Sequence, residues 1–181
     1  TLRDGEQTPG VVFSPEDKLE IAMLLDEIGV ERIEAGMPAV SEADRKAIRM
    51  IVNANLKSRV FAFSRATRGD IDLAKECGVH GVIIETPTSE PKLKYQFPNW
   101  SEQDVIDKSI DAVKYAKSLG LETIYFGYDT TRADEGFLFR LYGALLRQVT
   151  PDGIGMVDTM GCILPGAMFE IVRKLVKTFS V

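Results

Sequence analysis

Short apolar runs alternate with longer amphipathic stretches along the whole chain. The runs most typical of buried strands lie at residues 32–36, 60–64, 81–85, 123–126 and 154–158. In the stretches between them, apolar residues recur every three or four positions, which is the spacing of a helix packed on one face. This alternation predicts an α/β fold in which parallel strands are joined by helical crossovers.

Serine residues mark the starts of three predicted helices. Ser14, Ser41 and Ser101 each stand three residues before an aspartate. In that position the serine hydroxyl can accept a hydrogen bond from an N-terminal N–H, and the carboxylate lies at the positive end of the helix. Glycines suited to the left-handed conformation mark the predicted helix ends: Gly29, Gly78 and Gly120.

The spacing of the strands favours a barrel. Their centres recur at roughly 30 residues, which is the repeat of a (β/α)8 TIM barrel of about 250 residues. We expect an incomplete barrel that runs from the end of strand 1 through helix 6, as one domain over residues 1–181. A doubly wound sheet of six strands is the alternative. No glycine-rich phosphate loop follows a predicted strand, which makes a dinucleotide fold less favoured.

Composition and charge exclude several function classes. The net charge is −5, so a nucleic acid or an anionic membrane is not an expected partner. No apolar run approaches the ~18 residues of a membrane span, and the first residues do not resemble a signal peptide. Cys77 and Cys162 stand far apart with no metal-like spacing, so a reducing cytoplasm is the expected compartment.

Residues 86–100 form the one irregular stretch. They contain three prolines, together with Lys92, Lys94 and Tyr95. Because this segment exceeds the ordinary length of a strand-to-helix loop, it is either a lid or binding loop or a plain surface insertion.

Polar and ionisable residues follow nearly every predicted strand, where the catalytic residues of a TIM barrel lie. They are residues 3–7, Glu34, Ser64, Arg65, Glu85, Thr86, Asp129, Asp158 and Thr159. Each alone could cap a helix or be a solvated charge, but the set indicates a site. Asp4 can hold a divalent cation, Arg3 can stabilise an enolate, and Thr159 can bind a substrate carboxylate. His80 precedes a strand, so we expect a structural role for it.

The first ten residues, Thr-Leu-Arg-Asp-Gly-Glu-Gln-Thr-Pro-Gly, resemble the signature of the metallolyase-type TIM barrels. This superfamily, with its pyruvate carboxyltransferase-like domain, includes 2-isopropylmalate, citramalate and homocitrate synthases. Three further segments match in order: residues 33–38, residues 64–66, and residues 158–161 with Pro165. The resemblance covers essentially the whole chain.

The resemblance implies an acyltransferase that condenses acetyl-CoA with a 2-oxo acid in a Claisen-type reaction. It also implies a divalent metal (Zn, Mg or Mn) and a possible homodimer. Carried over by position, Arg3, Glu34 and Asp129 are catalytic and Asp4 is a metal ligand. The substrate-binding residues are Gln7, Ser64, Arg65 and Thr159.

Two departures from the family pattern matter. The His-x-His metal pair of the family follows strand seven, and this chain stops before it, so we expect the sequence to be part of a longer protein. The family's Phe-Ser-x-Glu pattern is here Phe-Gly-Tyr-Asp at residues 126–129. Asp129 would then replace the glutamate, and Tyr128 would narrow the pocket, which leaves the identity of the 2-oxo acid open.

Two alternatives to a synthase stay open. A lyase or aldolase acting on a 3-hydroxy acid would keep the fold and the metal. Glu6 argues against it, because 3-hydroxy-3-methylglutaryl-CoA lyases usually carry leucine at this position, and Pro9-Gly10 also has the synthase form. The second alternative is a non-catalytic pseudoenzyme that has lost the metal pair.

Overall fold

The computed structural model describes residues 2–180 and contains one curved, open sheet of parallel strands. The strands lie side by side in chain order. They are β1 (Arg32–Glu34), β2 (Arg59–Arg65), β3 (Gly81–Pro87), β4 (Glu122–Tyr128) and β5 (Gly153–Met156). The five strands expected at residues 32–36, 60–64, 81–85, 123–126 and 154–158 are all present, with their ends shifted by at most a few residues.

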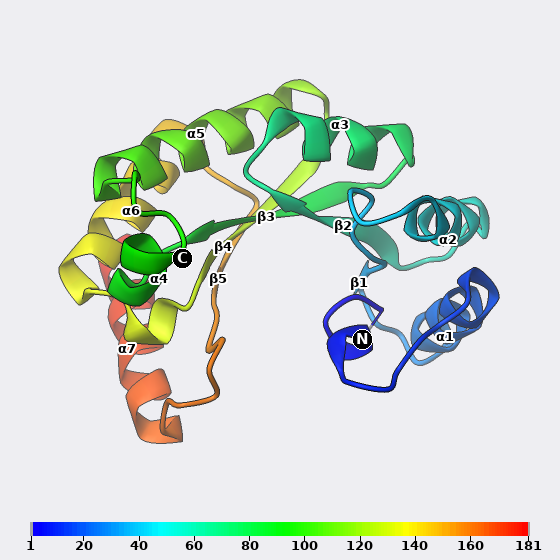
Figure 1. Cartoon of the computed structure of the whole chain (residues 1–181), viewed down its shortest axis with the longest axis horizontal. Helices are drawn as coiled ribbons and strands as arrows, with labels where there is room; N and C mark the ends of the chain where they lie inside the picture. The colour runs from blue at the N-terminus through cyan, green and yellow to red at the C-terminus, as the bar shows by residue number, and fades with distance from the viewer. Residues whose placement is uncertain (1, 181) are drawn as a thin grey trace.

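The helices cover the convex side of the sheet and leave its concave side open (Figure 1). The large helices are α1 (Pro15–Glu27), α2 (Glu42–Asn53), α3 (Arg68–Glu76), α5 (Glu102–Ser118), α6 (Glu135–Gln148) and α7 (Pro165–Phe179). A doubly wound sheet would reverse its strand order and carry helices on both faces. That alternative is therefore wrong, and the structure is the open half-barrel expected of part of a TIM barrel.

The segment expected to end a first strand has a different structure. A 3-10 helix, η1 (Gly5–Gln7), follows Asp4, and turns make up the rest of residues 2–10. Local hydrogen bonds, from the Gln7 amide to the Asp4 carbonyl and from the Thr8 amide to the Gly5 carbonyl, occupy the backbone groups that a strand would offer to a neighbour. Leu2 is fully buried in the core, and Thr1 lies outside the described residues.

The predicted helix starts and ends are confirmed. Ser14 and Ser101 each form a reciprocal capping box with the aspartate three residues later, and the Ser41 hydroxyl accepts from the Asp44 amide at 3.1 Å. The glycines at the three predicted helix ends all have positive φ, where a side chain would be strained: Gly29, Gly78 and Gly120.

Residues 86–100 are more regular than expected. Thr86 and Pro87 complete β3, and the short helix α4 (Glu90–Tyr95) follows. Ser89 starts this helix, because its hydroxyl accepts from the Lys92 amide at 3.4 Å. The segment therefore places a helix above the carboxyl edge of β3.

Side chains alternate between the two faces of the sheet. Those on the convex face pack against the helices, with Val60, Val82 and Ile84 almost fully buried. Those on the concave face form a second, smaller cluster of Phe61, Phe63 and Ile83, with Met37, Ile124 and Phe126 packed against it. The sheet is therefore apolar on both faces, as expected for parallel strands. No helix within residues 2–180 is long and apolar enough to cross a membrane.

Ile84→Ala tests the convex core. Ile84 is fully buried, so its truncation leaves a cavity and should lower the free energy of unfolding by about 2–5 kcal/mol. Val12→Ala is the control, because Val12 is 88% exposed and its change should stay within about 0.5 kcal/mol. Urea unfolding followed by circular dichroism measures both. Equal effects in the two variants would contradict this packing.

Candidate functional site

Arg3 is fixed at the carboxyl edge of β1 and β2. Its Nε donates a hydrogen bond to Oε1 of Glu34 at 2.5 Å, across 31 positions of sequence. Its guanidinium carbon lies 4.1 Å from the centroid of the Phe63 ring. Both charged side chains are about four-fifths buried, with exposed fractions of 20% and 21%. The result is a permanent cation in one orientation, facing the concave side of the sheet.

Asp4 lies beside this pair but faces solvent. Its Oδ1 is 3.7 Å from NH1 of Arg3, and its side chain is 81% exposed. Within residues 2–180, no group of three or more His, Cys, Asp or Glu side chains is arranged to hold a metal ion. Asp4 is therefore a single candidate ligand, and the described residues do not complete a metal site around it.

Glu85 joins the group from β3. The strand register places it directly beside Arg65 of β2 and Phe126 of β4. Burial raises the pKa of Glu85 to about 7; Arg3 opposes this rise, while Glu34 and Asp4 add to it. Glu85 was expected at a strand end, but no role was assigned to it. Glu85 stands two positions after Ile83, so strand alternation puts both side chains on the same face of the sheet. This spacing was the signal in the sequence that could have identified Glu85.

Tyr128 is the last residue of β4 and, by strand alternation, lies on the concave face with Ile124 and Phe126. Its hydroxyl donates to Oε1 of Gln96 at 3.1 Å, and Nζ of Lys92 in α4 lies 5.7 Å from its ring centroid. Burial raises its pKa to about 12, helped by the charges of Glu85 and Asp129. The phenol is therefore neutral at physiological pH.

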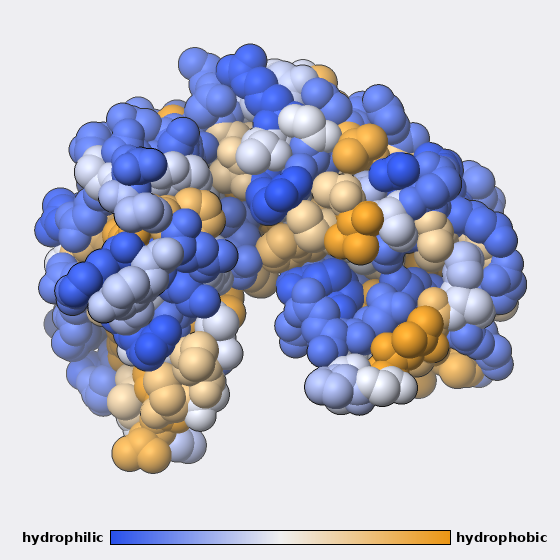
Figure 2. Space-filling view, viewed as in Figure 1, coloured by the Kyte–Doolittle hydropathy of each residue, from blue (hydrophilic) through white to orange (hydrophobic). Residues whose placement is uncertain are grey.

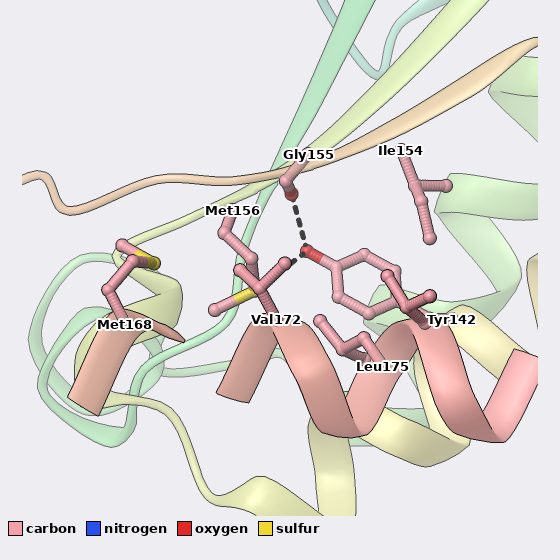
Figure 3. A pocket seen from close by; sticks show the side chains of 8 residues that line it. Tyr142, Ile154, Gly155, Met156, Met168, Val172 and Leu175 are labelled. Atoms are coloured by element: carbon pink, nitrogen blue, oxygen red, sulfur yellow. Dashed lines mark hydrogen bonds between the residues drawn. The ribbon is translucent and has the colours of Figure 1, made fainter. Parts of the chain in front are cut away.

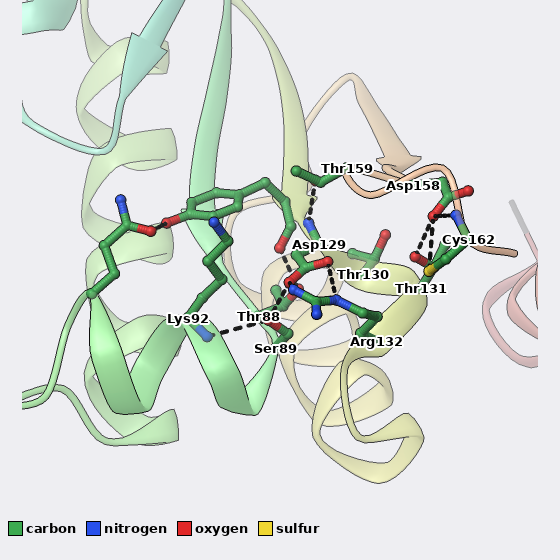
Figure 4. Close-up of polar contacts among 12 residues, drawn as sticks. Thr88, Ser89, Lys92, Asp129, Thr130, Thr131, Arg132, Asp158, Thr159 and Cys162 are labelled. Carbon is green, nitrogen blue, oxygen red and sulfur yellow. Dashed lines mark hydrogen bonds and ion pairs between the residues drawn. The ribbon is translucent and has the colours of Figure 1, made fainter.

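Asp129 belongs to a different environment from the one expected. It has a left-handed backbone (φ 61°) and a fully buried side chain. Its carboxylate accepts from Ser89 and from two guanidinium nitrogens of Arg132 (Figure 4). Burial alone would raise its pKa, but these hydrogen bonds more than offset that effect, and the pKa lies below its ordinary value. These contacts give Asp129 a structural role, and its catalytic role stays a prediction.

Thr159, in the loop after β5, lies next to Asp129 at the end of β4. Its Oγ1 accepts from the Asp129 amide at 2.8 Å, while the residue itself is exposed (Figure 4). Asp158 accepts from the Thr131 hydroxyl at 2.7 Å and from the amides of Cys162 and Ile163. Asp158 therefore stabilises the loop, and Thr159 presents its other side to solvent.

The remaining predicted residues join neither group. Gln7 is exposed in η1. Ser64 is fully buried, and its hydroxyl donates to the Arg65 carbonyl at 2.8 Å. Arg65 is 63% exposed and donates two hydrogen bonds to Asp70 of α3, at 2.7 and 2.8 Å. Their substrate contacts stay predictions. His80 has the expected structural contact, because its Nδ1 accepts from the Val60 amide at 3.0 Å.

A separate apolar hollow lies between β5 and α7. Its volume is about 490 Å³, and Tyr142, Ile154, Met156, Val172 and Leu175 are among its lining residues (Figure 3). The Tyr142 hydroxyl inside it donates to the Gly155 carbonyl at 2.7 Å. Figure 2 shows further apolar surface on the lower left arm, which holds the loop after β5 and the start of α7 in Figure 1. The exposed apolar residues of these segments include Met160, Leu164 and Phe169. This lining offers no charged group for chemistry, unlike the group around Arg3.

Named relatives resemble this chain over nearly its whole length. A homocitrate synthase (AksA) of Methanopyrus kandleri is 45% identical over 175 residues, which are 97% of this chain and 44% of the relative. The (R)-citramalate synthase CimA of Methanocaldococcus jannaschii is 40% identical, over 99% of this chain and 36% of the relative. A 2-isopropylmalate synthase of the same organism is 38% identical, over 100% and 35%. The chain thus spans less than half the length of these relatives.

The fold is that of part of a TIM barrel. The crystal structure of hydroxymethylglutaryl-CoA lyase from Pseudomonas aeruginosa superposes with a TM-score of 0.79 at 17% identity, over 97% of this chain and 61% of that one. The HMGL-like family model matches residues 1–180. Since this match covers almost the whole chain, the chain belongs to the HMGL-like family.

Proposed function

We propose that this chain forms most of the catalytic barrel of an enzyme that condenses acetyl-CoA with a 2-oxo acid. The observation that carries the proposal is the fixed cation of Arg3, held by Glu34 and by the Phe63 ring at the edge of the sheet. Relatives named homocitrate, citramalate and 2-isopropylmalate synthases support the same reaction class. The partners in this proposal are acetyl-CoA and a 2-oxo acid, in the cytoplasm.

Arg3 has the properties that the reaction requires. Removal of a methyl proton from a thioester leaves negative charge on the thioester oxygen, and the charge on the 2-oxo group rises when the new bond forms. A guanidinium that is already oriented stabilises this charge without reorganising during the reaction. Glu34 does not need to touch the substrate for this purpose. It is a positioning residue that fixes the direction of the Arg3 donors.

The divalent metal has weaker support from these residues. Asp4 offers one exposed carboxylate, and the described residues 2–180 hold no cluster that completes its coordination. Gln7 follows Asp4 by one turn of η1, and Thr159 lies at the opposite end of the carboxyl edge. Both are exposed, and we propose them as contacts for the 2-oxo acid.

The purified protein should release free thiol from acetyl-CoA when a divalent metal and one suitable 2-oxo acid are present. A panel of pyruvate, 2-oxoisovalerate and 2-oxoglutarate, followed with a thiol reagent, identifies the acceptor. Cleavage of 3-hydroxy-3-methylglutaryl-CoA in place of condensation would assign the chain to the lyase alternative. Absence of both reactions would favour the non-catalytic one.

Arg3→Lys should lower kcat by about 10²–10³, because a point charge does not reproduce the guanidinium donors aimed at the oxyanion. Arg59→Lys is the matched control. Arg59 also pairs with a carboxylate of the sheet, Glu122, but at the amino end of the strands. Steady-state kinetics of both variants, with circular dichroism as a check on folding, decide the point. A loss in Arg59→Lys equal to that in Arg3→Lys would remove Arg3 from the mechanism.

Tyr128→Ala should shift the preference toward larger 2-oxo acids, because it removes the ring that closes the concave face at the end of β4. Tyr95→Ala is a suitable control, since Tyr95 is an aromatic residue of α4 that is 76% exposed. The ratio of kcat/KM values across the substrate panel is the measurement. If that ratio is the same as in the wild type, Tyr128 does not line the acceptor pocket.

A further inference from the structure

We propose that Glu85 is the general base of this site and removes the methyl proton of the acyl-CoA. The inference rests on the proposed condensation and assigns its proton transfer to a residue with no role in the family pattern described above. Three observations carry it: the direction of the Glu85 side chain, the lack of a partner for its carboxylate, and the charges that surround it.

The side chain of Glu85 faces the concave side of the sheet. Gly81, four positions earlier in β3, lies under the Phe61 ring, so a Cβ there would overlap that ring. Phe61 and Ile83 belong to the concave cluster. Because side chains alternate along a strand, Gly81, Ile83 and Glu85 share this face. Glu85 is the last of them before Pro87 ends the strand, which puts it at the carboxyl edge.

Glu85 differs from the other acids on this face in its partners. Glu34 binds Arg3, and Glu122 at the amino end binds both Arg32 and Arg59. Among residues 2–180, no side chain or backbone group forms a hydrogen bond with the Glu85 carboxyl. Since no fully buried side-chain oxygen in the described residues lacks a partner, the oxygens of this half-buried carboxyl are open to solvent and available to a ligand.

Burial favours the protonated form of Glu85 near neutral pH, and the charges around it act in both directions. Arg3 is the cation that acts on it, and Glu34 and Asp4 are like charges from the same side. From β4, Tyr128 adds a neutral phenol, and Asp129 is neutralised by Arg132. On β2, Arg65 lies opposite Glu85 in the strand register, but its guanidinium is bound to Asp70. Three carboxylates thus share one nearby guanidinium, and Glu85 can gain or lose a proton without breaking a bond.

This state suits a general base whose working pH is close to its own pKa. A Glu85 carboxylate oxygen takes one proton from the acyl-CoA methyl, and the C–H electron pair becomes an enolate whose oxygen faces Arg3. The enolate carbon forms the new C–C bond to the 2-oxo carbon, and the carbonyl electrons move to oxygen. That alkoxide takes the proton back from Glu85. Hydrolysis of the thioester by water then releases the thiol and a new carboxylate.

The first test needs no turnover. In protein labelled with ¹³C at the glutamate side-chain carboxyls, the NMR resonance of Glu85 is the one that is missing from the spectrum of Glu85→Gln. In the wild type this resonance should titrate with a midpoint near pH 7. Glu34→Gln should lower that midpoint, because it removes a negative charge near Glu85 and lets the Arg3 guanidinium act more strongly on the Glu85 carboxylate. Since folding raises this pKa, wild-type protein loses stability relative to Glu85→Gln as the pH rises from about 4.5 to 7. A midpoint near 4.5 would overturn the inference.

The second test uses the condensation assay. Glu85→Gln should lower kcat by about 10²–10⁴ and abolish the rise of kcat/KM with a midpoint near pH 7. Glu122→Gln, at the amino end of the same face, should keep the wild-type pH profile. An active Glu85→Gln with an unchanged profile would refute the role of Glu85 alone. Failure of the wild type to release thiol with any 2-oxo acid would instead refute the proposed function.

Discussion

The parallel pairing of the strands in chain order is the constraint on which the site depends. It places all five carboxyl ends at one edge and makes each second residue face the concave side. Arg3 and Glu34 are 31 positions apart, yet they meet because the segment before α1 and the end of β1 reach the same edge. Without this pairing the strand-end residues would be separate surface charges with no common chemistry.

The two ends of the concave face have opposite electrostatic character. At the amino end, Glu122 is matched by Arg32 and Arg59, so the charges are satisfied within the protein. At the carboxyl end, carboxylates outnumber the cation that they share, and the excess charge makes the site receptive to protons or to a cationic ligand. Apolar side chains, including Phe61 and Ile83, separate the two ends and limit the access of water between them.

A difference of one position at the end of β4 separates Asp129 from Tyr128. Tyr128 continues the concave series of the strand. The next residue turns into a left-handed conformation and buries its carboxylate against Arg132 and Ser89. A motif match gives residue types and order, but it does not give the face on which each side chain lies, and a shift of one residue reverses that face. The same reasoning applies to Ser64, which is buried while Phe63 lines the site.

The sequence by itself determined the helix caps, the five strands, their parallel connection, the position of Glu34 at a strand end and the motif that contains Arg3 and Asp4. These features depend on local chemistry: serine and glycine at helix ends, apolar period, and short motifs. Only the tertiary structure decided which charges meet. The partner of Arg3, the unpartnered carboxyl of Glu85 and the burial of Asp129 depend on register and on the direction of side chains across the sheet, since electrostatic interactions act through space between residues far apart in sequence.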